Sequence, residues 1–93
     1  MVIGILELEI KLFSGSSLKD KRRIIKSLIE RIRNNFNVSV SEIRHQDLWQ
    51  RAGLGIAFLT TEGRFAQSIL SKIVDFIKED KKISLIDSKM EIM

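Results

Sequence analysis

Cysteine, proline and tyrosine are absent from this chain of 93 residues, and histidine and tryptophan each occur once. Without cysteine, the chain has no disulfide framework, no thiolate metal site and no cysteine nucleophile. Because His45 is the only histidine, a multi-histidine metal site within one chain is excluded as well. At this length, the absence of proline and of low-complexity linkers predicts a single domain over residues 1–93.

Long apolar runs are also absent, and no stretch approaches the length of about 20 residues that a transmembrane helix needs. The first residues, MVIGILELEIKLF, have no basic start and carry Glu7 and Glu9, so they do not resemble a signal peptide. Hydrophobic residues at 44% and charged residues at 30% are typical of a soluble globular domain. We therefore expect a cytoplasmic protein without a membrane partner.

The segment from Ser17 to Phe36 predicts one amphipathic helix with two opposed sides. At about 100° per residue, its apolar side chains gather on one side of the helix and its basic side chains gather on the opposite side. The apolar side carries Leu18, Ile25, Leu28, Ile29, Ile32 and Phe36. The basic side carries Lys19, Arg22, Arg23, Lys26 and Arg33.

This helix holds the net positive charge of the chain. Residues 19–33 include seven basic and two acidic side chains, a net charge of +5, whereas the whole chain carries +4. Ser17 is a suitable N-cap, supported by Asp20, and the asparagines at 34, 35 and 37 suit an exit that includes a left-handed residue. Lys21 falls on the apolar side, so we expect it to snorkel or to reach toward the sheet edge.

Four further segments are predicted as strands, the last of them with poor alternation that leaves its buried face unassigned, and one more has helical spacing. Strands are predicted at residues 2–13, 37–44, 51–60 and 83–93, and a second helix from about 61 to 79. Ile43 is out of step with Val38 and Val40, which predicts a bulge or the end of the strand. The second helix has an apolar stripe of Phe65, Ile69, Ile73, Phe76 and Ile77.

The order of the elements predicts an α+β, ferredoxin-like βαββαβ fold. Such a fold has a four-stranded antiparallel sheet with two helices on one face, and the third strand lies beside the first. RNA-binding proteins that bind bases on the open sheet face use aromatic side chains there. Here the first strand offers Glu7, Glu9 and Lys11 instead. If RNA is bound, we therefore expect the first helix, rather than the sheet, to bind it.

A row of small residues, Gly53, Gly55 and Ala57, occupies one face of the third strand. Such a row admits close packing, either by a second chain or by the side chain of Trp49 lying over the gap. A thinly covered solvent face is the alternative. The close-packing interpretation makes Trp49, Gly53, Gly55 and Ala57 an interface, and it predicts a homodimer or a higher oligomer.

His45 and Asp47, together with the serine-rich turn 14–17, form the best candidate for a catalytic or small-ligand site. A helix N-terminus with basic neighbours can hold an anion, but helix capping explains the serines equally well. No third group converges on His45 and Asp47, so little of an active site is present. We assign no catalytic residue, cofactor, metal or small-molecule substrate, and we expect a protein that is not an enzyme.

Two motifs taken together, Ser17 to Arg23 and Asp47 to Ala52, resemble the YlxP-like family, the bacterial domain of unknown function 503. The similarity runs over almost the whole chain. The resemblance implies a ferredoxin-like fold and a bacterial cytoplasmic protein that is often encoded beside transcription and translation-initiation factors. A role near the ribosome or its assembly follows as an expectation, and the resemblance supplies no catalytic residues.

The sequence thus favours a non-enzymatic binding module over two alternatives. The module would bind structured RNA or a ribosomal subunit through phosphate contacts from the basic side of the first helix. One alternative is a structural or regulatory homo-oligomer that packs through its sheet face. The other is that the basic side is a solvated surface or binds an acidic protein, since the same charges serve each case.

Overall fold

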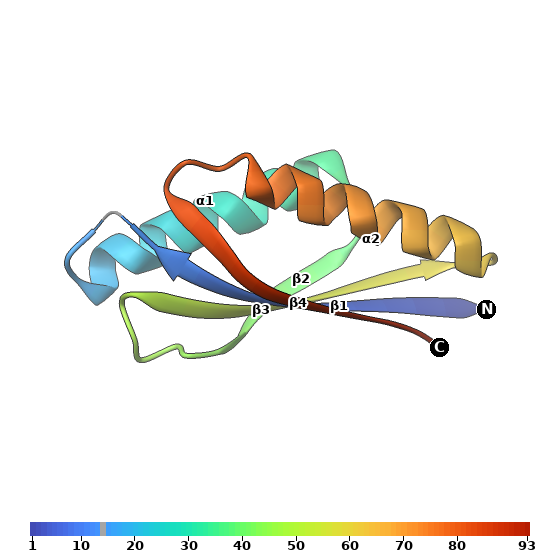
Figure 1. Ribbon diagram of the computed structural model, residues 1–93, viewed down its shortest axis with the longest axis horizontal. Helices are drawn as coiled ribbons and strands as arrows, with labels where there is room; N and C mark the ends of the chain where they lie inside the picture. Colours follow the sequence, from blue (N-terminus) through green and yellow to red (C-terminus); the bar gives the residue numbers. More distant parts are fainter. Residues whose placement is uncertain (14) are drawn as a thin grey trace.

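The computed structural model describes residues 1–13 and 15–93, and its elements follow the predicted order. They are β1 (Val2–Leu12), α1 (Leu18–Asn35), β2 (Ser39–Arg44), β3 (Arg51–Thr60), α2 (Gly63–Lys78) and β4 (Ile83–Ile92). The strands form one sheet in the order β2-β3-β1-β4, with antiparallel neighbours throughout. Both helices lie on the same side of it (Figure 1). The ferredoxin-like α+β fold is therefore confirmed.

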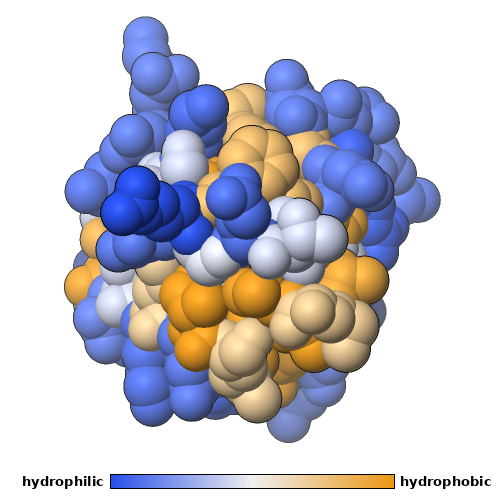
Figure 2. Space-filling model, turned by 90° about the vertical axis from the view of Figure 1, so that its right-hand side faces the viewer, coloured by the Kyte–Doolittle hydropathy of each residue, from blue (hydrophilic) through white to orange (hydrophobic). Residues whose placement is uncertain are grey.

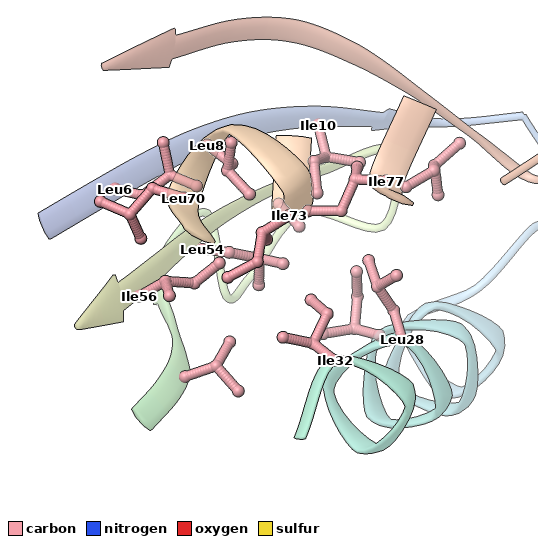
Figure 3. Packing of buried hydrophobic residues seen from close by; sticks show 14 of the residues in the cluster. Leu6, Leu8, Ile10, Leu28, Ile32, Leu54, Ile56, Leu70, Ile73 and Ile77 are labelled. Atoms are coloured by element: carbon pink, nitrogen blue, oxygen red, sulfur yellow. The ribbon is translucent and has the colours of Figure 1, made fainter. Parts of the chain in front are cut away.

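Alternation along β1 and β3 divides the sheet into two faces. The face toward the helices is apolar, and Figure 3 shows its side chains pointing toward those of both helices. This core includes Leu6, Leu8, Ile10, Leu54, Ile56, Leu28, Ile32, Leu70, Ile73 and Ile77. The other face, which we call the open face, carries the charged and small residues of β1 and β3 and has no helix over it.

The capping of α1 is confirmed at its start and differs from the expectation at its end. The Asp20 N–H donates to Ser17 Oγ at 3.2 Å, and the Ser16 N–H donates to Asp20 Oδ2 at 3.2 Å. At the other end, Phe36 is extended, with φ −138°, so the exit uses no left-handed residue. An extended exit keeps the Phe36 ring on the core side, where it meets Phe76 edge-on at a centroid distance of 5.7 Å. Ser14, the first residue of the predicted turn, lies outside the described residues.

The apolar stripe of α2 is rotated relative to the prediction. Its buried row is Ala66, Leu70, Ile73 and Ile77. Phe65, which was expected in the stripe, is 49% exposed, and its ring packs at the edge against Phe58 with centroids 5.6 Å apart. The helix lies close to β1 here, since a Cβ on Gly4 would come within 3.2 Å of Ala66 Cβ. A small residue therefore belongs at the centre of the contact and a phenylalanine at its margin.

Two irregularities interrupt the ladder. In β2 the register shifts between Glu42 and Arg44, so Ile43 is the extra residue of the predicted bulge. In β4 the register shifts where Glu9 pairs with Asp87 and Ile10 with Leu85, which explains the poor alternation of that strand. Among the described residues, neither helix is long and apolar enough to span a bilayer.

Candidate nucleic-acid interface

The basic side of α1 faces solvent because the opposite side is committed to the core. Ile25, Leu28 and Ile32 are buried against the sheet, which turns the far side of the helix outward. All five predicted cations are exposed there: Lys19, Arg22, Arg23, Lys26 and Arg33. We call this set the basic face. The most exposed side chains of α1 are all polar, whereas Leu18, Ile24 and Ile29 are only partly exposed along its flanks.

A groove of about 320 Å³ runs between α1 and the edge strand β2. Arg22, Lys26 and Arg33 supply its positive charge, and Ile25, Ile29 and Val40 supply its apolar lining. Glu30 and Glu42 also line it. The groove therefore joins three members of the basic face along one flank of the helix.

Arg33 differs from the other members because it has a partner within the chain. Its Nη2 donates to the carbonyl oxygen of Val40 at 3.0 Å. Val40 belongs to an edge strand, whose outward carbonyls lack a strand partner, so Arg33 satisfies one of them. Among the described residues, the side chains of Lys19, Arg22, Arg23 and Lys26 make no hydrogen bond or ion pair, and they remain free to contact a ligand.

Lys21 reaches the sheet edge, as its place on the apolar side predicted. Its side chain is only 1% exposed, and Nζ lies 2.8 Å from Glu42 Oε2. Nζ also donates to the carbonyl oxygen of His45. A buried ammonium group is tolerated only with such partners. Lys21 therefore ties α1 to β2 and to the connection after it, and it contributes no exposed charge to the basic face.

On the open face, an ion-paired cluster lies over the half of the sheet near the start of α1. His45 Nε2 is 2.7 Å from Glu9 Oε2, and Arg51 Nε is 3.4 Å from the same oxygen. Arg44 Nη1 is 2.9 Å from Glu7 Oε1. The partner of His45 is thus Glu9 rather than Asp47, which is exposed. Within residues 1–13 and 15–93, no group of three or more His, Asp or Glu side chains is placed to hold a metal ion.

The glycines of β3 make this cluster sterically feasible. Arg44 belongs to β2 and Glu7 to β1, so the arginine must cross β3 to reach its partner. A Cβ on Gly53 would lie 2.7 Å from Arg44 Cβ, and one on Gly55 would lie 3.1 Å from the side chain of Ile43. The nearest atoms over these two glycines are therefore those of Ile43 and Arg44 rather than of Trp49. Ala57, the third member of the row, is exposed.

A second group of cations, which the sequence analysis missed, lies on the other flank of α1. A hollow of about 210 Å³ is lined by Arg23, Ile24, Ser27, Arg31 and Lys82. Arg31 Nη2 lies 2.8 Å from Asp80 Oδ2, and the Lys82 N–H donates to Asp80 Oδ1 at 2.8 Å. Lys82 is distant from α1 in sequence, so no helical spacing points to it.

The Asp80 carboxyl is 7% exposed, and its pKa is shifted. Burial opposes ionisation, but hydrogen bonds from Arg31 and from the Lys82 backbone, with the charges of both residues, outweigh it. The net effect holds the pKa of Asp80 below its ordinary value. The ionised Asp80 therefore anchors the turn between α2 and β4 to α1.

Solved structures similar to this one support the fold. A de novo designed protein with ferredoxin fold, LFR1 1, matches with a TM-score of 0.54 and 15% identity, covering 100% of this chain and 84% of the designed one. Another designed protein, Foldit4, matches with a TM-score of 0.53 and 16% identity, covering 98% and 96%. At such identities the similarity shows the fold alone.

The sequence comparisons agree with the resemblance of the two motifs. A family model described as "Protein of unknown function (DUF503)" matches residues 3–90. The "Uncharacterized protein YlxP" of Bacillus subtilis (strain 168) is 40% identical over 76 residues, which cover 82% of this chain and 83% of that protein. The chain therefore belongs to the DUF503 family of proteins of unknown function.

Proposed function

We propose that this protein is a non-enzymatic RNA-binding module that docks on the structured RNA of a ribosomal subunit through the basic face. The observation that supports the proposal is that the basic side chains of α1 divide into one buried residue and a row of exposed ones. Lys21 is withdrawn into a buried ion pair, whereas Lys19, Arg22, Arg23 and Lys26 project outward without partners in the described part of the chain.

The dimensions of the basic face suit a phosphate backbone. With a rise of about 1.5 Å per residue, Lys19 and Arg33 lie about 21 Å apart along the helix axis, a span of several consecutive phosphates. Arg22 and Lys26 are separated by one turn, or about 6 Å. Neutralising phosphates releases condensed counterions, so binding of this kind weakens steeply as salt is added.

The most exposed side chains of α1 are all polar, and this favours RNA over an acidic protein. Protein interfaces have a dehydrated core enriched in aromatic residues and methionine, and charged residues are depleted from that core. The outward surface of α1 carries arginine, lysine, Glu30, Ser27 and asparagine instead. Phosphate contacts need no apolar core, because charge and hydrogen bonding supply most of the affinity.

The test is binding to purified small ribosomal subunits across a salt series. One variant carries Lys19→Gln, Arg23→Gln and Lys26→Gln, and its matched control carries Lys72→Gln, Lys78→Gln and Lys89→Gln, which lie on α2 and β4. Each variant lowers the formal net charge from +4 to +1. We expect the first variant to bind weakly, with a salt slope reduced by about two, and the control to bind like the native protein. Equal loss of binding in both variants would show that affinity depends only on the net charge of the protein, and this would contradict the proposal.

A second candidate function, assembly with further copies of the chain through the open face, is favoured by an exposed apolar area. Beyond the ion-paired cluster, the open face carries Ile3, Ile5, Ala57 and Leu59 in adjacent register, and Leu59 is 62% exposed. Figure 2 shows apolar side chains gathered at the end of the molecule where both termini lie. Trp49, which precedes β3, lies at the opposite end of this face from Ala57.

This candidate is tested by sedimentation over a range of protein concentrations. If the open face binds a second copy, the native protein dimerises and Leu59→Lys restores the monomer, while Ser71→Lys, at an exposed position on α2, leaves the dimer intact. A native protein that stays monomeric at every concentration would contradict assembly.

A further inference from the structure

Two exposed aromatic side chains lie at the end of the sheet away from the termini. Phe13 follows β1 and is 65% exposed, and Trp49 precedes β3 and is 39% exposed. The Leu12 N–H donates to the Gln50 carbonyl at 2.9 Å, and Phe13 and Trp49 are the immediate chain neighbours of these two bonded residues. Figure 1 shows the β2–β3 connection at the same end of the molecule as the start of α1.

The connection that carries Trp49 is held from several sides. The His45 carbonyl accepts hydrogen bonds from Lys21 Nζ and from the Leu48 N–H, and His45 Nε2 pairs with Glu9. His45 itself takes a left-handed conformation, with φ 61°, which is uncommon for residues other than glycine. These contacts hold both ends of the turn 45–48, which directly precedes Trp49.

Single exposed aromatics are common, so their exposure alone says little. What distinguishes this pair is the charge around it. Lys11 pairs with Arg51 in the register beside the aromatics, and the carbonyl of Lys82 accepts the Phe13 N–H at 2.9 Å. Lys11 and Lys82 are exposed, whereas Arg51 is partly buried and pairs with Glu9. Asp47 is an acidic residue in the same connection.

Aromatic rings among cations are the combination that single-stranded nucleic acids require. Successive bases stack on aromatic side chains while lysine and arginine follow the phosphates. The Lys21 contact with the His45 carbonyl places the β2–β3 connection beside the first turns of α1, where Lys19, Arg22 and Arg23 are exposed.

We propose that Trp49, with Phe13 beside it, is a stacking platform for an unpaired nucleobase. This inference rests on the proposed function and refines it: the RNA contacted by the basic face includes an unpaired or bulged nucleotide near the start of α1. The platform lies at the end of the sheet. RNA-binding domains that stack bases on a sheet of this kind carry their aromatic side chains on the central strands instead.

The experiment uses Trp49 as its own reporter, because it is the only tryptophan of the chain. Intrinsic fluorescence is followed during titration with three polyanions: a single-stranded oligoadenylate, a fully paired RNA duplex of equal length, and heparin, which has no bases. Binding is measured in parallel by sedimentation. We expect the oligoadenylate to quench the fluorescence, and the duplex and heparin to bind in a salt-dependent manner with little quenching.

Variants test the same claim with fluorescently labelled oligoadenylate. Trp49→Ala should lower the affinity by about 5- to 100-fold, the usual effect of removing one stacking ring. Trp49→Phe, which keeps an aromatic face, should retain most of it. Phe65→Ala is the control, because Phe65 is also an exposed aromatic residue but lies on α2 at the other end of the molecule.

The outcomes separate the two proposals. Salt-dependent binding of all three polyanions, without quenching and with no effect of Trp49→Ala, overturns the stacking platform and leaves the basic face supported. Failure of every RNA to bind overturns both. If Trp49→Ala weakens binding to intact small ribosomal subunits but not to oligoadenylate, Trp49 contacts a ribosomal protein, and the stacking platform is again overturned.

Discussion

At the scale of single residues, the cations of α1 have two different roles although they are close in sequence. Lys19, Arg22 and Arg23 face solvent, whereas Lys21 between them is buried with Glu42 and the His45 carbonyl. Removing an ammonium group from water is costly, and the cost is offset only by close partners. The Lys21 pair therefore contributes to the positioning of α1 on the sheet, not to ligand binding.

Lys21→Met removes the ammonium group and keeps most of the apolar stem. Glu42, whose side chain is 19% exposed, then loses its cation, and the His45 carbonyl loses a donor. We expect the free energy of unfolding to fall by about 2 to 4 kcal/mol, measured by urea denaturation. Lys19→Met, at an exposed position of the same helix, should change it by no more than about 0.5 kcal/mol.

The double variant Lys21→Met with Glu42→Leu distinguishes the ion pair from general damage to packing. Replacing both charged partners removes the unpaired carboxylate, so the double variant should be more stable than Lys21→Met alone. Additive losses from the two substitutions would show that Lys21 and Glu42 are not coupled, contrary to the geometry.

Asp80 links stability to pH. Its pKa is lowered in the folded state, so below the ordinary aspartate pKa of about 3.9 the unfolded state binds more protons, and stability falls as pH falls. Above that value both states are ionised, and the contribution of Asp80 is constant and fully present. Native protein should therefore be more stable than Asp80→Asn at pH 7, and the difference should shrink as the pH is lowered below about 4.

Denaturation curves for both proteins between pH 7 and pH 2 measure this difference. Asp75→Asn, an exposed aspartate on α2, controls for the general effect of acid on the remaining carboxylates. A stability difference between native protein and Asp80→Asn that stays constant down to pH 2 would show that the Arg31–Asp80 pair does not stabilise the ionised carboxylate.

At the scale of elements, β3 lies between β2 and β1 and has glycines on its open face. A side chain from β2 can therefore cross β3 and reach β1. Gly53→Ala places a methyl group 2.7 Å from Arg44 Cβ and 3.4 Å from its backbone, so β2 must shift and the Arg44–Glu7 pair is strained. We expect a loss of about 1 to 3 kcal/mol in the free energy of unfolding.

Gly63→Ala provides the matched control for this substitution. Its Cβ would meet Ile92 Cγ2 at 3.8 Å, an ordinary contact, and Gly63 begins α2. Alanine there should be neutral or stabilising by up to about 1 kcal/mol. Equal destabilisation by both substitutions, measured by thermal unfolding, would contradict the crossing of β3 by Arg44.

Elements whose periodicity matches one buried face were predictable from the sequence. The bounds of α1, β1 and β3 came within one or two residues, and the bulge at Ile43 followed from a break in alternation. The stripe of α2 was misplaced, because the close approach of Gly4 to Ala66 selects the smaller residue for the centre of the contact.

The ion-paired cluster on the open face was not predictable in the same way. The sequence analysis assigned Glu7 and Glu9 no partners, because their partners come from β2, from the connection after it and from the start of β3. Placing Arg44 and His45 over β3 requires both the strand order and the bulge at Ile43. The glycines opposite Glu7 and Glu9 were the available signal, and it becomes meaningful only once the register is known.

At the scale of the whole molecule, chemically different surfaces occupy separate regions. The basic face covers the outer side of α1, and the open face divides into an ion-paired half and an apolar half. Exposed aromatics lie where the sheet ends beside the start of α1. If the basic face binds RNA and the open face binds a second copy, as proposed, this separation lets the two contacts form independently.

The most direct test of the central claim is lysine footprinting with a small acylating reagent and mass spectrometry, in the presence and absence of small ribosomal subunits. The basic face predicts that bound subunits protect Lys19 and Lys26, while Lys72, Lys78 and Lys89 react at unchanged rates. Lys21 should react slowly in both states because it is buried and paired. If subunits bind but Lys19 and Lys26 react as fast as in the free protein, the basic face of α1 is not the RNA-binding surface.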